Sequence, residues 1–269
     1  MQSLFTESAD GVFVPGPLAV SGWGDQIRGL AVSALLARGA ERRMAESGRD
    51  DLRPARWTLE LFRPARMAPL AVTADVIRLG RRIGLIDVGL RQGDGLVARA
   101  TALYLAPAEP VVGRVWSPVP DTAVPPTPAE RVDDGVERLY RSGDGDWVTP
   151  DLVEPGAERN HAWQYPLPLL DGETPTPFQA LAGAADVANA VLNMGTHGLE
   201  FINTDVTLQI TRLPSGLEVG MSGADRIEGD GVMTGSVYLF DADGVVGLAT
   251  IVGLANPSAA VDMRKFGRH

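Results

Sequence analysis

The sequence has no cysteine, a single lysine and only three histidines, and each shortage excludes a class of chemistry. Without a thiol there can be no disulfide, no cysteine nucleophile and no zinc–thiolate centre. His161, His197 and His269 lie far apart, and no His-x-x-x-His pair, Gly-x-Ser-x-Gly elbow or P-loop occurs. We therefore expect neither a metal site nor a bound cofactor.

Positive charge is also scarce, because 24 basic residues stand against 34 acidic ones among 269 residues. The resulting net charge of −10 is uneven: residues 1–110 carry +2 and residues 111–269 carry −12. Such a surface argues against nucleic acid or an anionic membrane as the main partner. The N-terminus lacks the pattern of a signal peptide, and the longest apolar stretch is too short to span a membrane. We expect a soluble, cytoplasmic protein.

Proline is concentrated in one part of the chain, with seven prolines between Pro107 and Pro128. Proline fixes φ and removes a backbone donor, so this run predicts an extended connection rather than a helix or a central strand. An acidic segment follows, with one short helix expected near residues 131–140. We predict an N-terminal unit in residues 1–110, a linker in residues 111–160 and a C-terminal unit in residues 161–269.

The two predicted units share a repeat. The segment Thr58–Pro64 resembles Thr207–Pro214, and an offset of 149 residues relates their first positions. The same offset relates Asp94-Gly95 to Asp243-Gly244 and Ala100-Thr101 to Ala249-Thr250. A constant offset over such a distance indicates a tandem duplication of one unit.

Each unit begins with a segment of helical apolar spacing and continues with strand-like segments only. Asp-Gly pairs mark hairpin turns between those segments. One helix followed by an antiparallel meander, given twice, predicts an α+β fold. The expected helices are residues 25–44 and 177–194; the expected strands are residues 56–62, 70–79, 83–92 and 95–105 in the first unit and 206–211, 216–227, 231–241 and 245–254 in the second.

This order, a central helix wrapped by a curved antiparallel sheet, is that of the hot-dog fold, and two copies make a double hot-dog. The sequence also resembles the acyl-CoA thioesterase II family of the thioesterase-like superfamily. The resemblance rests on Gly24-Asp25-Gln26, on Leu61-Phe62-Arg63-Pro64, on Asp205 seven residues before Arg212, and on the run from Phe240 to Gly244. It covers most of the chain outside the linker.

The resemblance implies a catalytic aspartate, a hydroxyl residue and a glutamine, all in the second unit. Asp205 falls on the aspartate and is expected to act as a general base that activates water. The hydroxyl position falls near Ala224 or Asp225, with Ser222 or Thr250 as substitutes if the register shifts. The glutamine position falls on Val252, which cannot hydrogen-bond through its side chain.

Two further groups are expected to bind substrate. Gly24, Asp25 and Gln26 are placed at the start of the first helix, where unpaired backbone amides could hold a thioester oxyanion. Capping by Asp25 is the competing interpretation. A basic cluster, Arg78, Arg81 and Arg82, suits the phosphates of coenzyme A, although a solvated strand edge is the favoured interpretation of these three residues.

The leading hypothesis is a thioester hydrolase of lipid metabolism that acts on acyl-CoA. The alternative is a non-catalytic acyl-CoA or acyl-carrier binding protein on the same fold, since two of the three family positions are not retained. A third possibility, an acyl-CoA hydratase, would need an Asp/His pair, but Asp186, the only acid on the second helix, has no histidine at helical spacing. The resemblance also implies a homo-oligomer, a dimer or a tetramer.

Overall fold

The computed structural model describes residues 2–8, 11–110, 112–117, 120–125 and 136–266. Its first half contains helix α1 packed on an antiparallel meander of four strands. The side chains of these strands alternate between a buried face and an outer face, as in a sheet covered on one side. The bounds are α1 (Gly29–Glu46), β5 (Arg53–Leu61), β6 (Leu70–Leu79), β7 (Ile83–Gln92) and β8 (Gly95–Leu105).

The second half repeats this arrangement, with the difference that its helix is divided in two. Asp186 N–H donates to Gly183 O at 3.1 Å and Val187 N–H donates to Ala184 O at 2.9 Å, so the chain tightens there before it continues as a second helix. The bounds are α2 (Pro177–Ala185), α3 (Ala188–Asn193), β14 (Asp205–Ile210), β15 (Val219–Gly229), β16 (Val232–Asp241) and β17 (Gly244–Ala255).

Shorter elements flank the two halves and complete the sheet. They are β1 (Phe5–Glu7), β2 (Val12–Pro15), η2 (Pro17–Ala19), β3 (Val20–Ser21), β4 (Gly24–Ile27), β9 (Arg138–Ser142), η3 (Pro150–Leu152), β10 (Asn160–Gln164), β11 (Met194–Gly195), β12 (Gly198–Leu199), β13 (Phe201–Asn203), η4 (Pro257–Ala259) and η5 (Met263–Phe266).

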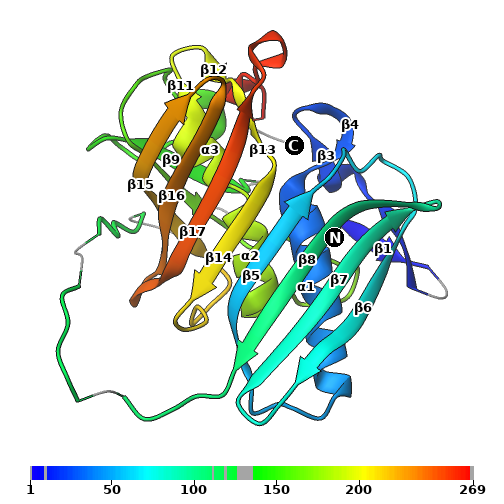
Figure 1. Cartoon of the computed structure of the whole chain (residues 1–269). Coiled ribbons are helices and arrows are strands. Elements are labelled where there is room, and N and C mark those ends of the chain that lie inside the picture. Colours follow the sequence, from blue (N-terminus) through cyan, green and yellow to red (C-terminus); the bar gives the residue numbers. More distant parts are fainter. Residues whose placement is uncertain (1, 9–10, 111, 118–119, 126–135, 267–269) are drawn as a thin grey trace.

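One sheet of 13 strands joins the two halves, and the helices lie together on one face of it (Figure 1). The strand order is β1-β2-β6-β7-β8-β5-β14-β17-β16-β15-β10-β9, and β13 pairs with β17 beside this path. The central pair, β5 and β14, is antiparallel and aligns Thr58 with Thr207. On the far side of each strand, Thr58 pairs with Thr101 of β8 and Thr207 pairs with Thr250 of β17. The residues related by the 149-residue offset therefore sit symmetrically about the centre of the sheet.

Most of the expected elements are confirmed, three of the strands with identical bounds. The single second helix is wrong, because the chain divides it into α2 and α3. The first helix begins four residues later than expected, since residues 24–27 pair with β3 as strand β4. The prediction of a short helix near residues 131–140 is wrong for its last residues, because strand β9 begins at Arg138. The earlier part of that prediction falls in residues 126–135, which lie outside the described residues.

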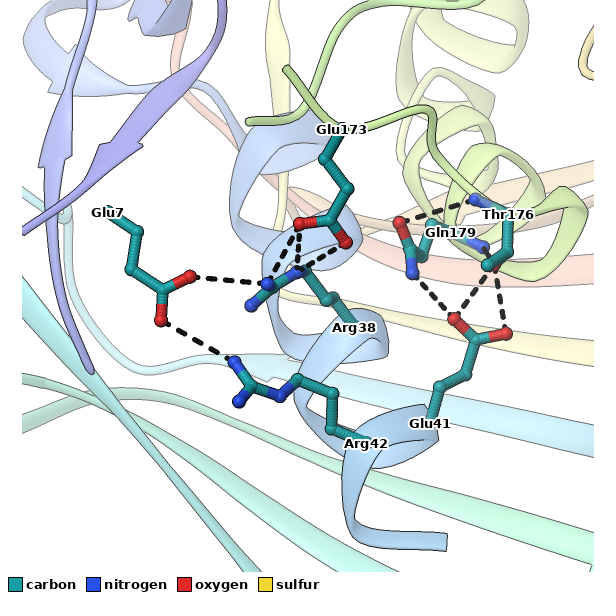
Figure 2. Close-up of polar contacts among 7 residues, drawn as sticks. All are labelled: Glu7, Arg38, Glu41, Arg42, Glu173, Thr176 and Gln179. Atoms are coloured by element: carbon teal, nitrogen blue, oxygen red, sulfur yellow. Dashed lines mark hydrogen bonds and ion pairs between the residues drawn. The ribbon is translucent and has the colours of Figure 1, made fainter. Parts of the chain in front are cut away.

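A polar junction on α1 holds the start of α2 (Figure 2). The Glu41 carboxylate accepts hydrogen bonds from Thr176 Oγ1 at 2.9 and 2.8 Å and from Gln179 Nε2 at 2.7 Å. Thr176 and Gln179 also form the capping box of α2. Burial raises the pKa of Glu41, although these hydrogen bonds oppose the rise.

Arg38 continues the junction one turn earlier on α1, and its guanidinium contacts carboxylates from two other segments. It lies 2.9 Å from Glu173 and 3.2 Å from Glu7 (Figure 2). Close packing accompanies these contacts, because Gly183 of α2 lies against Ala34 of α1. Together they fix the two helices side by side. No helix in the described ranges has the length and hydrophobicity that a membrane span requires.

Candidate active site

A cavity of about 490 Å³ opens where the N-terminus of α1 meets the break between α2 and α3. Both halves of the chain form its wall, together with the C-terminal segment, and a cavity of this size suits a small-molecule ligand. Its apolar wall includes Trp23, Ile27, Leu30, Leu61, Ile202 and Met263, and its polar wall comprises Ser21, Gln26, Arg28, Arg63, Glu137, Arg138, Asp186, Asn189, Asn203 and Thr204.

Asp186 lies on the cavity wall at the helix break. Its Oδ1 accepts a hydrogen bond from Asn203 Nδ2 at 2.9 Å, and its carboxylate also accepts one from the backbone N–H of Leu30. The residue lies deep in the protein but keeps a partly accessible surface on the cavity side. Burial raises the pKa of Asp186, while the Asn203 hydrogen bond, the charge of Arg138 and the Leu30 amide oppose that rise.

The first residue of α1, Gly29, makes this contact possible. A Cβ on Gly29 would collide with both carboxylate oxygens of Asp186, so only glycine allows the carboxylate to approach the helix. The N-cap residue of α1, Arg28, makes no side-chain capping bond. A carboxylate from the other half of the chain therefore stands at the positive end of the α1 dipole, which stabilises its ionised form.

A chain of amides on α3 supports this polar corner. Asn189 Nδ2 donates to Phe201 O at 3.1 Å, and Asn193 Nδ2 donates to Asn189 Oδ1 at 2.9 Å. Arg226 Nε then donates to Asn193 Oδ1 at 3.2 Å. Because each amide is tied to the next, α3 and the strand that carries Asn203 are held in a fixed relation to Asp186.

An ion pair forms another part of the wall. Arg28 Nη1 and Nη2 donate to the two carboxylate oxygens of Glu137 at 2.6 and 2.9 Å. Arg28 Nε donates to Leu18 O at 2.6 Å, and Nη2 also contacts that carbonyl. Arg138 follows on β9 and is tied to Gln164 and Tyr140. These side chains make one side of an otherwise apolar cavity polar.

Comparison with known families identifies the chain. Residues 20–105 match the N-terminal domain of acyl-CoA thioesterase, and residues 115–255 match its C-terminal domain. The chain belongs to the acyl-CoA thioesterase family. No curated protein sequence matches it.

Solved structures similar to this thioesterase-family chain share its fold. The tesB protein of Mycobacterium avium subsp. paratuberculosis has 17% identity and a TM-score of 0.61, with 94% of this chain and 96% of that chain covered. Acyl-CoA thioesterase II TesB2 of Mycobacterium marinum has 14% identity and a TM-score of 0.61, with 94% of each chain covered. A conserved hot-dog-fold protein of Alicyclobacillus acidocaldarius has 17% identity and a TM-score of 0.60, with 93% and 95% covered. The fold is thus that of the hot-dog proteins, with an antiparallel sheet and few helices.

Asp205, the aspartate to which the thioesterase resemblance points, lies at the start of β14. Its neighbours Val206 and Leu208 are buried against the core, so alternation turns its side chain toward the opposite face of the sheet. Its Oδ1 accepts from the backbone N–H of Val252 at 2.9 Å and from Thr204 Oγ1 at 3.4 Å. Thr204 lines the cavity, but Asp205 does not.

The three residues expected at a helix start lie on strand β4 instead. The expectation that they open the first helix is wrong, because that helix begins at Gly29. Gln26 lines the cavity, whereas Gly24 and Asp25 are exposed and do not line it. Gly24 has a φ of 111°, which fits its place in the turn between β3 and β4.

The basic cluster Arg78, Arg81 and Arg82 is exposed around the turn between β6 and β7. That turn lies beside Leu105, at one end of β8, whereas Leu61 at the cavity pairs with Ala98 near the other end. The seven-residue distance along β8 is roughly 23 Å at the rise of a strand. The structure brings Arg63, not this cluster, to the cavity.

The remaining positions implied by the thioesterase resemblance lie away from the cavity. Ala224 and Asp225 are on β15, next to an irregularity in its pairing with β16. Val252 is on β17 with an exposed side chain, and its backbone N–H donates to Asp205. None of the three lines the cavity, and neither do Ser222 and Thr250.

Asp186, Asn203 and Gly29 are the residues of this corner that sequence reasoning did not select. One signal was available for Asp186, since it is the only acid in an otherwise apolar helical segment, and a buried charge needs a reason. No comparable local signal marks Gly29 or Asn203, because their role depends on contacts between the two halves.

Proposed function

We propose that the protein hydrolyses acyl-CoA thioesters and that Asp186 is the general base. The observation that carries this proposal is the carboxylate of Asp186, accessible from the cavity and held by Asn203 and by the N-terminus of α1. Burial raises its pKa, which makes the carboxylate a stronger base than an exposed aspartate. Membership of the acyl-CoA thioesterase family supports the substrate class.

The reaction follows from the groups on the cavity wall. A water molecule hydrogen-bonded to Asp186 and to Asn203 Oδ1 attacks the thioester carbonyl carbon and gives its proton to the Asp186 carboxylate. The oxyanion that develops is assigned to the first backbone amide of α1 and to the second proton of Asn203 Nδ2. The C–S bond then breaks, the proton on Asp186 passes to the departing sulfur, and the products are a carboxylic acid and free coenzyme A.

Asp205 remains a second candidate base, because it occupies the family's aspartate position. We place Asp186 before it because Asp186 lies on the cavity wall and is surrounded by donors from both halves. The two carboxylates can be separated by experiment, since each has an isosteric asparagine variant.

The decisive measurement is thiol release from acyl-CoAs of two to eighteen carbons by the wild type and by Asp186→Asn and Asp205→Asn. We expect Asp186→Asn to reduce kcat by about 10² to 10⁴, the contribution of a general base, with little change for Asp205→Asn. Asp205→Asn should keep the wild-type thermal unfolding profile within a few degrees, and Asp186→Asn should not lower Tm. The opposite pattern of rates would assign catalysis to Asp205 and reject Asp186.

The runner-up is a non-catalytic acyl-CoA or acyl-carrier binding protein. It is favoured by Val252, which cannot take the part of the family's glutamine. Calorimetry that detects tight binding of acyl-CoA, together with no thiol release above the buffer rate, would establish this alternative and exclude hydrolysis.

We propose the same division of the chain as the sequence predicts: two units in residues 1–110 and 161–269, with a linker in residues 111–160, folded as a double hot-dog. The symmetric pairing of Thr58 with Thr207 supports it. Cytoplasmic location and a role in lipid metabolism stay predictions. So does assembly into a dimer or a tetramer, which light scattering of the purified full chain would test.

A further inference from the structure

Arg138 differs from the other charged residues of the cavity wall because only two of its three guanidinium nitrogens donate hydrogen bonds to the described part of the protein. Its Nε donates to Gln164 Oε1 at 2.6 Å and its Nη1 donates to Tyr140 Oη at 2.9 Å. The guanidinium also lies over the Tyr140 ring, 5.8 Å from its centroid. Gln164 and Tyr140 are both buried, so the orientation of the guanidinium is fixed. Its third nitrogen, Nη2, has no hydrogen-bond partner among the described residues.

The other charged groups of the wall either have partners in the protein or are exposed to water. All three nitrogens of Arg28 are bonded, to Glu137 and to Leu18 O. Asp186 is bonded to Asn203 and to Leu30 N–H. Arg63 is exposed at the edge of the cavity and keeps contact with bulk water. Arg138 lines the cavity and is only partly exposed, so a ligand that fills the cavity would remove water from its guanidinium.

A donor that loses its water without gaining an acceptor is costly, and more so when it is charged. A plain alkyl chain offers no acceptor. The less exposed charges of the wall already offset one another, because Arg28 pairs with Glu137 and Arg138 acts on Asp186, whereas the remaining cation, Arg63, is exposed to bulk water. An additional carboxylate would upset this balance, whereas an uncharged oxygen would not.

We propose that Nη2 of Arg138 binds an uncharged oxygen on the acyl chain, so that the preferred substrates are acyl thioesters bearing a hydroxyl or keto group. The inference rests on the proposed hydrolysis for its substrate class, and it adds a specificity-determining residue to the cavity. A side chain fixed by two hydrogen bonds is suited to this task, since the position of its remaining donor is set in advance.

The test compares hexanoyl-CoA with hexanoyl-CoAs that carry one hydroxyl at carbon 3, 4, 5 or 6. The quantity measured is the ratio of kcat/KM for each hydroxylated thioester to that for hexanoyl-CoA. For the wild type we expect a ratio of about 10 to 100 at one hydroxyl position, the scale of one hydrogen bond to a charged group. Because the charge of Arg138 also acts on Asp186, absolute rates can change in a variant, but the ratio isolates recognition of the oxygen.

Three variants separate recognition of the oxygen by Arg138 from other effects of substitution. Arg138→Met removes the donor and should bring the ratio to about 1. Arg138→Lys keeps the charge but loses the anchored geometry, so it should also lower the ratio while its pH profile stays close to the wild type. Arg53→Met, at an exposed position of β5 outside the cavity, is the matched control and should keep the wild-type ratio.

A wild-type ratio near 1 at every hydroxyl position would overturn the proposal, as would an Arg138→Met ratio equal to that of the wild type. Failure of the proposed hydrolysis is a separate result: no thiol would be released from any of the five thioesters. The same ratio would then be taken from dissociation constants measured by calorimetry with the intact thioesters. The same loss of preference in Arg138→Met would support the recognition, and its absence would reject it.

Discussion

Replacing Gly29 with alanine would place a methyl group against the carboxylate of Asp186. A Cβ built at this position lies 2.6 Å from Asp186 Oδ2 and still closer to Oδ1, so one partner must move. Relief of such crowding in a packed interior costs about 1–3 kcal/mol. The carboxylate must retreat by something on the order of 1 Å, and a displacement of that size at a reacting centre can cost about 10² in rate. We therefore expect kcat to fall about 10²-fold.

Gly39→Ala provides the matched control, because Gly39 is on the same helix, outside the cavity wall. A Cβ there would lie 2.8 Å from Val72 Cγ1, so it also crowds the core. Both variants should lose stability by a similar amount, with a fall in Tm of about 2–4 °C per kcal/mol. Thiol-release kinetics and thermal unfolding would be measured side by side. Equal kcat values for the two variants would refute the role given to the contact between Gly29 and Asp186.

Three other predictions follow from the charges. Because the pKa of Asp186 is raised, kcat/KM should increase with pH through that raised value. Asn203→Ala removes a hydrogen bond that lowers this pKa, so it should move the acid limb of the pH profile to higher pH. Asp186→Asn should raise Tm at neutral pH. A carboxyl whose pKa is higher in the folded than in the unfolded state destabilises the fold once pH rises through the folded pKa, by about 1.4 kcal/mol for each pKa unit of difference, and asparagine does not ionise. Arg212→Ala should cost about 2 kcal/mol by removing charged hydrogen bonds to the buried Asp241, a loss measured by urea unfolding at neutral pH. That loss should shrink as pH falls below the ordinary carboxyl range, since the Arg212 hydrogen bond is the main cause of the lowered pKa of Asp241.

The strands were predictable because alternation and turn chemistry agree. In β8, Ala98, Ala100 and Ala102 are buried while Arg99 is exposed, and the two-residue turn before this strand contains Gly93 with a φ of 55°. The same alternation would have shown that Asp205 faces away from Val206 and Leu208, and hence away from the helices. The Arg212 motif was informative for the fold rather than for catalysis, since Arg212 pairs with Asp241 at 2.6 Å.

The polar corner around Asp186 was not predictable, because no local pattern encodes it. Asp186 meets Gly29 and Leu30 only after the two halves pack, and the first helix begins where β4 ends rather than at the capping signal of Asp25. The pairing of β4 with β3 overrode the local signal. A sequence pattern records which face of an element is buried, but not which distant side chain will lie against its end.

Each half of the chain places a carboxylate at the start of the other half's helix. Asp186, at the end of α2, reaches the start of α1, and Glu41, on α1, reaches the start of α2. At the start of α2, the side chains of Thr176 and Gln179 hydrogen-bond the carboxylate of Glu41, so groups of the protein occupy the position that a substrate would need. The starts of α1 and α2 thus correspond in the repeat, but the cavity borders only the start of α1. On the proposed function, we therefore expect each chain to bind one acyl group, with the start of α2 serving as scaffold.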